Sequence, residues 1–309
     1  VGVTFMLWPS IDIEDASSLA HQLGIPHEVI DLSLSFRDRV IDYFLREYSL
    51  GRTPNPCIRC NRYIKFDALQ RVAREVGAGL IATGHYARVS RDGSRYFLKK
   101  GVDKDQSYFL YLMTQNELAH TIMPLGDMNK DRVRGMAREL GLPERPDSQE
   151  ICFIPDKDYH RFLMENIPQA ARPGPIVDRD GRTLGDHQGI PFYTIGQRRG
   201  LGISTGEPLY VSAICHEGNA VIVGGKGELY RDELIASGLN WIAIERLEQP
   251  MEVKAKIRYL HHEARALITP MDGERVHVSF SQPQMAITPG QAVVFYDGDS
   301  VVGGGVMDG

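Results

Sequence analysis

The feature that most constrains the fold is a helix, a glycine and a strand that follow one another twice in the first third of the chain. The two copies are a helical pattern over 12–23 with Gly24 and a strand over 27–31, and a helical pattern over 61–76 with Gly77 and a strand over 80–85. This alternation predicts an α/β fold, a parallel sheet with helices on both faces. Ligands bind beyond the carboxyl ends of such strands, so we expect the site near Cys57–Cys60 and Gly84–His85.

Other segments of the first 158 residues fit this architecture. We expect a buried strand over 1–7, a helix over 37–48, a hairpin over 89–98 that turns at Asp92–Gly93, and a helix over 131–140 with its apolar residues inward. Gly and Pro become frequent after about residue 158. The sequence thus predicts an α/β domain over 1–158 and a small, irregular middle domain over 159–230.

The last segment, 231–309, has the alternation of a β-structure. Val253, Ala255 and Ile257 alternate with charged residues, and Val276 and Val278 alternate with polar ones. Turn signals at 272–273, 289–290 and 297–298 separate the strands. This pattern predicts a small antiparallel β-barrel.

The composition is that of an ordinary globular protein. The chain has 309 residues, 24% charged and 42% hydrophobic, and a net charge of −5, which argues against indiscriminate nucleic-acid binding but allows a local basic face. No apolar run is long enough to span a bilayer, so we expect a cytoplasmic protein with no membrane partner. Four cysteines are too few for a disulfide framework and favour reactive or metal-binding thiols.

Cys57-Ile-Arg-Cys60 is a C-x-x-C motif, which alone is compatible with a redox pair, half a zinc site or part of an iron–sulfur site. A zinc site needs two further ligands, and no second C-x-x-C or H-x₃-H is present. Asn61 has the character of a helix cap. We therefore expect the helix N-terminus to lower the pKa of the Cys60 thiol and activate it.

The other two cysteines differ in context. Cys152 lies in the apolar stretch Glu-Ile-Cys-Phe-Ile, typical of a packed strand cysteine, but the preceding polar run 147–150 favours a strand or loop end facing a site. Cys215 has no such context, and we interpret it as structural.

Several polar residues could bind a nucleotide or RNA. His85 follows a predicted strand, Lys104-Asp105-Gln106 offers a donor, an acceptor and an amide, and Arg198–Arg199 lies in a glycine-rich loop. Arg258 lies on the polar face of a predicted barrel strand. Each cation suits a phosphate contact, although each alone is also an ordinary exposed side chain.

Five motifs together resemble one family, the tRNA-specific 2-thiouridylases. They are Gly51-Arg-Thr-Pro-Asn-Pro-Cys-Ile-Arg-Cys-Asn-Arg-Tyr-Ile-Lys-Phe66, Ala82-Thr-Gly-His-Tyr86, Lys104-Asp-Gln-Ser-Tyr-Phe-Leu110, Asp147-Ser-Gln-Glu-Ile-Cys-Phe-Ile154 and Tyr193-Thr-Ile-Gly-Gln-Arg-Arg-Gly-Leu-Gly202. Their order and spacing match over nearly the whole chain, which is far more specific than a single C-x-x-C.

The resemblance implies an ATP-pyrophosphatase (PP-loop) domain, a middle domain and a C-terminal β-barrel. It implies replacement of oxygen by sulfur at C2 of the wobble uridine of tRNA, with ATP and Mg²⁺ as cofactors and with a sulfur-donor protein, a cysteine desulfurase or a relay protein, as a partner. The catalytic cysteine of the family corresponds to Cys60, and its persulfide-carrying cysteine corresponds to Cys152. Nucleotide contacts correspond to Met6 and Gly84. Contacts with the target base or with other parts of the tRNA correspond to Asn55, Pro56, Cys57, His85, Lys104, Asp105, Gln106, Arg258, Tyr259 and Gln291.

Two departures from the family pattern bear on this expectation. The phosphate-gripping loop Ser-Gly-Gly-x-Asp-Ser should precede Val1 and is not in this sequence. Cys57 stands where many relatives have Asp, so an acid–base role of that Asp does not transfer unchanged. Cys57, Cys60 and Cys152 could instead hold a 4Fe-4S cluster with one open iron.

Two other functions stay open at this point. One is a tRNA-binding protein without catalysis, since the visible chain lacks the phosphate loop. The other is a different PP-loop ligase or amidase, which would not need both Cys60 and Cys152.

Overall fold

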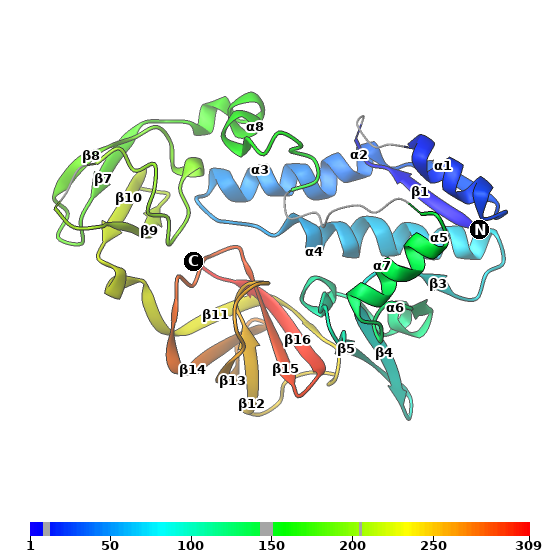
Figure 1. Cartoon of the computed structure of the whole chain (residues 1–309). Coiled ribbons are helices and arrows are strands. Elements are labelled where there is room, and N and C mark those ends of the chain that lie inside the picture. The colour runs from blue at the N-terminus through cyan, green and yellow to red at the C-terminus, as the bar shows by residue number, and fades with distance from the viewer. Residues whose placement is uncertain (9–12, 143–150, 204–205) are drawn as a thin grey trace. The chain divides into compact units, whose positions relative to one another are not determined.

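The computed structural model describes residues 1–8, 13–142, 151–203 and 206–309 (Figure 1). The chain divides into two compact units. The first contains residues 1–43, 56–155 and 298–301, and the second contains residues 44–55, 156–297 and 302–309. The predicted three-domain division at 158 and 230 stays a prediction.

The first unit confirms the α/β class. Its N-terminal part runs through β1 (Gly2–Met6), α1 (Ile13–Gln22), β2 (His27–Asp31), α2 (Ser33–Phe36), a π-helical turn (Arg37–Ile41) and the start of α3 (Asp42–Ser49), which belongs to the other unit from Phe44 onward. β1 and β2 pair in parallel, with Thr4 opposite Val29. β1 is only half-buried, which contradicts the expectation of a buried strand.

The rest of the first unit begins with a helical stretch made of α4 (Pro56–Cys60), a π-helical turn (Asn61–Phe66) and α5 (Asp67–Glu75). There follow β3 (Ile81–Ala82), β4 (Ala87–Asp92), β5 (Arg95–Lys100), a 3₁₀ turn (Ser107–Leu110), α6 (Gln115–Ala119), β6 (Thr121–Ile122) and α7 (Lys130–Glu139). β3 and β6 form a second parallel ladder. β4 and β5 form the predicted hairpin, with Asp92 opposite Arg95.

Two details of the predicted packing are wrong. The strand expected over 80–85 is limited to Ile81–Ala82, and Leu80 is 56% exposed. α7 is present as predicted, but it buries none of its residues, and Met136 and Leu140 are largely exposed. Helical spacing fixes which residues share a face, but it does not show whether another element covers that face.

The second unit holds two β-structures. After α8 (Tyr159–Asn166) and a 3₁₀ turn (Pro168–Ala170), the first is a four-stranded sheet in the order β8 (Thr183–His187), β7 (Gly174–Val177), β10 (Ala220–Gly224) and β9 (Tyr210–Cys215). Further 3₁₀ turns cover Ile190–Phe192 and Lys226–Leu229. The segment expected to be irregular therefore has a regular sheet.

The C-terminal part of this unit confirms the predicted β-barrel (Figure 1). Its strands are β11 (Tyr230–Trp241), β14 (Arg275–Met285), β13 (Ala264–Met271), β12 (Met251–Lys256), β15 (Ala292–Asp297) and β16 (Ser300–Met307), and pairing of β11 with β16 closes it. The residues predicted to point inward, including Val253, Val276 and Val278, belong to one buried core.

Candidate functional site

The C-x-x-C motif lies inside a helix rather than before one. α4 begins at Pro56, a residue suited to the first helical turn because it needs no backbone N–H donor there. Cys60 is the last residue of α4, and the chain continues without a break into the π-helical turn Asn61–Phe66. Such turns within helices are frequent at functional sites.

This register overturns the expected activation of Cys60. Asn61 does not cap a helix: it is buried, and its side-chain amide donates to the Phe109 carbonyl oxygen at 3.2 Å. Cys57, not Cys60, lies in the first helical turn. Burial raises the pKa of the Cys60 thiol to about 11, opposite to the predicted direction.

Cys152 lies in a turn that the Ile154 N–H closes by donating to the Ile151 carbonyl oxygen at 3.0 Å. It is not a packed strand cysteine, and it is exposed, whereas Cys60 is buried. The next residue, Phe153, is buried and lies edge-on against Phe36, with ring centroids 5.6 Å apart. This contact anchors the turn, while the preceding polar run 147–150 lies outside the described residues.

The three thiols Cys57, Cys60 and Cys152 share one environment and form what we call the cysteine cluster. Desolvation is the main cause that raises the pKa of each, to about 12 for Cys152. Charge on Cys57 and Cys60 raises the pKa of Cys152 further. As whole residues, Cys57 and Cys152 are nevertheless exposed, whereas Cys60 is buried. The structure therefore brings together the three cysteines that the sequence singled out.

The sequence interpretation missed a cation at this cluster, Lys65. Its charge lowers the pKa of all three thiols and so offsets part of the desolvation. Its ammonium group donates to Asn61 Oδ1 at 3.1 Å, and Asn61 is in turn held by the Phe109 carbonyl. Lys65 is four residues after Asn61, one helical turn, and this spacing was the available signal.

His85 is a second member of this environment. Its ring stacks on Phe66 with centroids 5.9 Å apart, and its Nδ1 lies 3.0 Å from Thr83 Oγ1. Burial, helped by the positive charge of Lys65, lowers its pKa to about 4. The imidazole is therefore neutral at physiological pH and offers a hydrogen bond rather than a charge.

The segment Lys104–Gln106 is hydrogen-bonded to Tyr86, the residue after His85. The Tyr86 N–H donates to Gln106 Oε1 at 2.9 Å, and the Gln106 N–H donates to the Tyr86 carbonyl at 2.8 Å. The Lys104 ammonium lies 5.2 Å from the centroid of the Tyr86 ring, and Asp105 accepts from the Ser107 N–H at 2.9 Å. The segment Lys104–Gln106 is thus held beside Tyr86, the residue that follows His85, in the first unit.

Arg59 is a further residue that sequence reasoning did not single out. Its guanidinium carbon lies 4.0 Å from the ring centroid of Tyr43 and 4.6 Å from that of Tyr63. Its Nε donates to the Arg39 carbonyl at 3.2 Å. Arg59 lies between the two cysteines of the motif in sequence, and two aromatic faces and a hydrogen bond hold its guanidinium in place.

The two residues expected to contact ATP end different strands. Met6 is the last residue of β1, and its carbonyl accepts from the Leu32 N–H at 2.9 Å. Gly84 follows β3, and a methyl group added there would meet only Leu125 Cδ1, at 3.8 Å. Both positions lie at carboxyl ends of parallel strands, and the backbone at Gly84 is open to close approach.

The remaining predicted tRNA contacts divide between the units. Pro56 is buried at the start of α4, in the first unit. Asn55, Arg258, Tyr259 and Gln291 belong to the second unit. There, Arg258 donates to the Met285 carbonyl at 3.0 Å, and Lys256 lies over the Tyr259 ring at 5.6 Å. The backbone of Gln291 bonds to Thr288 and Met307.

Over 1–8, 13–142, 151–203 and 206–309, no group of three or more His, Cys, Asp or Glu side chains is placed to hold a metal ion. No helix of the described part is both long and apolar enough to cross a bilayer.

Three family models match the chain in succession. They are described as a tRNA methyl transferase HUP domain over residues 8–156, a tRNA methyl transferase PRC-barrel domain over 160–225, and an aminomethyltransferase beta-barrel domain over 231–307.

Curated proteins named tRNA-specific 2-thiouridylase MnmA are similar to this chain over almost all of its length. The protein from Acetivibrio thermocellus is 49% identical, over 99% of this chain and 91% of its own length. The protein from Clostridium acetobutylicum is 50% identical, over 96% of this chain and 84% of its own. The protein from Symbiobacterium thermophilum is 52% identical, over 96% of this chain and 78% of its own length.

Proposed function

The chain belongs to the tRNA-specific 2-thiouridylase family, and we propose that it is a sulfurtransferase that replaces the C2 oxygen of the wobble uridine of tRNA with sulfur at the expense of ATP. The name that its relatives share supports tRNA thiolation. The observation that carries the proposal for this chain is the cysteine cluster, in which charge on Cys60 raises the pKa of Cys152 and the charge of Lys65 lowers the pKa of both thiols.

The reaction begins with activation of the uridine. A carbonyl oxygen is a poor leaving group, and transfer of AMP from ATP to the oxygen on C2 turns it into a good one, with release of pyrophosphate. The base must leave the anticodon stack to be reached. His85 and the Lys104–Gln106 segment, fastened together through Tyr86, form a surface suited to holding the displaced nucleotide.

Sulfur transfer then uses both cysteines. The terminal sulfur of a persulfide on Cys152 attacks C2 and expels AMP, which leaves C2 joined to Cys152 through two sulfur atoms. The Cys60 thiolate attacks the Cys152 sulfur, the bond between the two sulfurs breaks, and the electron pair leaves with the sulfur on C2. The products are 2-thiouridine, AMP and a Cys60–Cys152 disulfide, which a thiol reductant restores. The accessibility of Cys152 suits loading by a sulfur-donor protein.

The charges around the cysteine cluster favour these reaction steps. Only a thiolate attacks a disulfide, and burial alone keeps Cys60 protonated. Lys65 stabilises the anionic form of each thiol, and its hydrogen bond to Asn61 limits where its ammonium can go. The neutral His85 adds no second positive charge.

The described residues fit part of an ATP site. A nucleotide could approach the backbone at Gly84, and Met6 ends β1, the first strand of the parallel β1–β2 pair. We propose that ATP binds at these strand ends with Mg²⁺, and that Asn55, Pro56, Cys57, Arg258, Tyr259 and Gln291 contact tRNA. Within the described residues, the side chains of the cysteine cluster are not placed as a group that could hold a metal ion, and the proposed steps use the thiols alone.

The test is tRNA thiolation by the full-length protein. Unmodified tRNA, ATP, Mg²⁺ and a persulfide donor are incubated with the enzyme, and 2-thiouridine is measured by nucleoside mass spectrometry. We expect Cys60→Ser and Cys152→Ser each to lower the rate by at least about a hundredfold, because each removes a sulfur that takes part in a bond change. Cys215→Ser is the matched control, since Cys215 is exposed at the end of β9.

Other outcomes would change the proposal. Loss of product only in Cys60→Ser would remove Cys152 from the mechanism. Activity on another substrate that survives both substitutions would favour a different PP-loop enzyme. Tight tRNA binding without 2-thiouridine, under anaerobic conditions and with every substrate supplied, would favour a binding protein without catalysis.

A further inference from the structure

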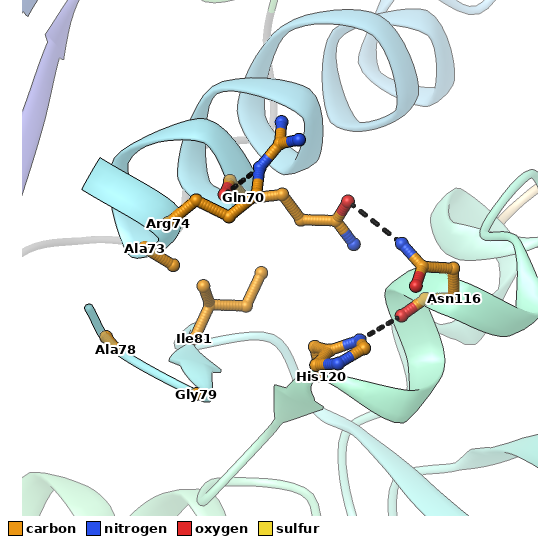
Figure 2. A pocket seen from close by; sticks show the side chains of 8 residues that line it. All are labelled: Gln70, Ala73, Arg74, Ala78, Gly79, Ile81, Asn116 and His120. Carbon is orange, nitrogen blue, oxygen red and sulfur yellow. Dashed lines mark hydrogen bonds between the residues drawn. The ribbon is translucent and has the colours of Figure 1, made fainter. Parts of the chain in front are cut away.

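A cavity of about 360 Å³ lies in the first unit, apart from the cysteine cluster (Figure 2). Its lining includes Gln70, Ala73 and Arg74 of α5, Ile81 at the start of β3, and Asn116 and His120 around α6. Because Ile81 begins β3 and Gly84 follows its carboxyl end, the cavity is at the amino end of the strand. The proposed nucleotide and sulfur sites are at the other end.

The cavity contains a buried hydrogen-bond donor that has no acceptor. Gln70 Nε2 is inaccessible to solvent and has no hydrogen-bond partner among the described residues. Gln70 Oε1 accepts from Asn116 Nδ2 at 3.3 Å, which orients the amide and turns its nitrogen toward the side of His120 (Figure 2). Buried donors in folded proteins nearly always have a partner, so an unpaired one calls for a ligand or an ordered water.

His120 supplies the complementary group. Its Nδ1 lies 2.8 Å from the Asn116 carbonyl oxygen, and since a carbonyl only accepts, this nitrogen carries the hydrogen. With the ring's single hydrogen on Nδ1, Nε2 is an acceptor. The cavity thus offers one donor and one acceptor, both oriented by Asn116.

The rest of the lining suits a flat ring with a charged substituent. Ala73 and Ile81 provide small apolar surface. Arg74 uses Nε to bond the Gln70 carbonyl at 3.3 Å, while its exposed guanidinium retains further N–H groups. Guanidinium groups of this kind bind phosphate in a bidentate manner. The volume is within the range of sites for small organic ligands.

We propose that this cavity is a second nucleotide site, which takes a nucleobase whose edge presents an acceptor to Gln70 and a donor to His120, with its phosphate at Arg74. All four RNA bases carry such a neighbouring donor and acceptor, so the chemistry selects a nucleobase rather than one base. The base can come from a free mononucleotide or from an unstacked position of the tRNA.

The experiment measures binding of AMP, CMP, GMP and UMP to the full-length protein by calorimetry at millimolar ligand. Gln70→Leu keeps the volume and removes the donor, and we expect the affinity for mononucleotides to fall about tenfold. Arg74→Gln should weaken mononucleotides but not the corresponding nucleosides. Arg71→Gln, on the exposed face of the same helix, is the matched control and should change neither.

Thermal unfolding keeps the test independent of folding defects. Without ligand, Gln70→Leu should melt at or above the wild-type temperature, because it removes an unpaired buried donor. Mononucleotide should raise the melting temperature of the wild type more than that of Gln70→Leu. Binding that is equal in wild type and Gln70→Leu would belong to another site and overturn the proposal, as would no binding of any of the four.

The source of the base is decided by tRNA affinity in the same variants. Weaker tRNA binding by Gln70→Leu assigns the cavity to a tRNA base, and unchanged tRNA binding assigns it to a free nucleotide. This site rests on the proposed function only for its tRNA source, and the two are tested separately. If mononucleotides do not bind through Gln70, the proposed thiolation is unaffected. If the enzyme does not thiolate tRNA but binds mononucleotides through Gln70, the proposed cavity site is still supported.

Discussion

The C-terminal barrel and the cysteine cluster both bury side chains, but burial has different consequences in the two places. In the barrel, Val276, Val278 and Phe295 are fully buried among other apolar residues, so burial contributes to the stability of the fold. At the cysteine cluster and the neighbouring His85, burial falls on thiols and on an imidazole, and it shifts their pKa values. Desolvation thus stabilises the fold in one region and tunes chemistry in the other.

The largest expected effect on stability comes from the barrel. Phe295 is fully buried and stacks on Trp241 with centroids 5.9 Å apart. Phe295→Ala should lower the free energy of unfolding by about 3–5 kcal/mol, because it removes apolar contacts and leaves a cavity. Urea denaturation followed by tryptophan fluorescence measures this. Cys60→Ser should lower the free energy of unfolding much less, although it abolishes thiolation. An equal loss of stability in both variants would mean that burial at Cys60 stabilises the fold as much as burial in the barrel does.

The next effect is a pH dependence that the barrel substitution should not alter. His85 has a pKa of about 4 when folded and an ordinary value of 6.5. As the pH falls below 6.5, the His85 imidazole becomes protonated in the unfolded chain but stays neutral in the folded one. His85 therefore lowers the free energy of unfolding by about 2 kcal/mol near pH 5. His85→Gln should lack this loss.

The measurement is the difference in unfolding free energy between about pH 7.5 and pH 5, in wild type and His85→Gln. Comparing the two proteins removes the contributions of the other histidines. An identical difference in both would mean that the imidazole is not desolvated in the folded protein. A smaller loss in wild type than in the variant would reverse the sign of the argument.

Regular, repeated patterns in the sequence predicted much of the fold. The alternation at Val253, Val276 and Val278 gave the barrel, and the Asp92–Gly93 turn gave the hairpin of β4 and β5, since local periodicity and turn chemistry decide both. The inward face assigned to α7 was wrong, because burial depends on which element covers a helix, and no periodicity encodes that.

The candidate site was predictable in its residues but not in its electrostatics. Scarcity of cysteine pointed to Cys57, Cys60 and Cys152, and the structure brings them into one environment. The direction of the Cys60 pKa was wrong because the helix begins at Pro56, five residues before the expected cap. Lys65 was missed because its relevance depends on the continuation of that helix through the π-helical turn.

The smallest effect tests Lys65 as the cation of the cluster. Lys65→Gln removes the charge that lowers the pKa of Cys60 and Cys152, so both pKa values should rise and less thiolate should be present at a given pH. Alkylation by iodoacetamide, followed at each cysteine by peptide mass spectrometry, should slow roughly threefold to tenfold at both residues. Lys65→Arg retains the charge and should recover most of the rate, and Cys215, outside the cluster, is the internal control. Unchanged or faster alkylation of Cys60 in Lys65→Gln would show that desolvation alone sets the reactivity of the cluster, and the two regions would then differ only in what they bury.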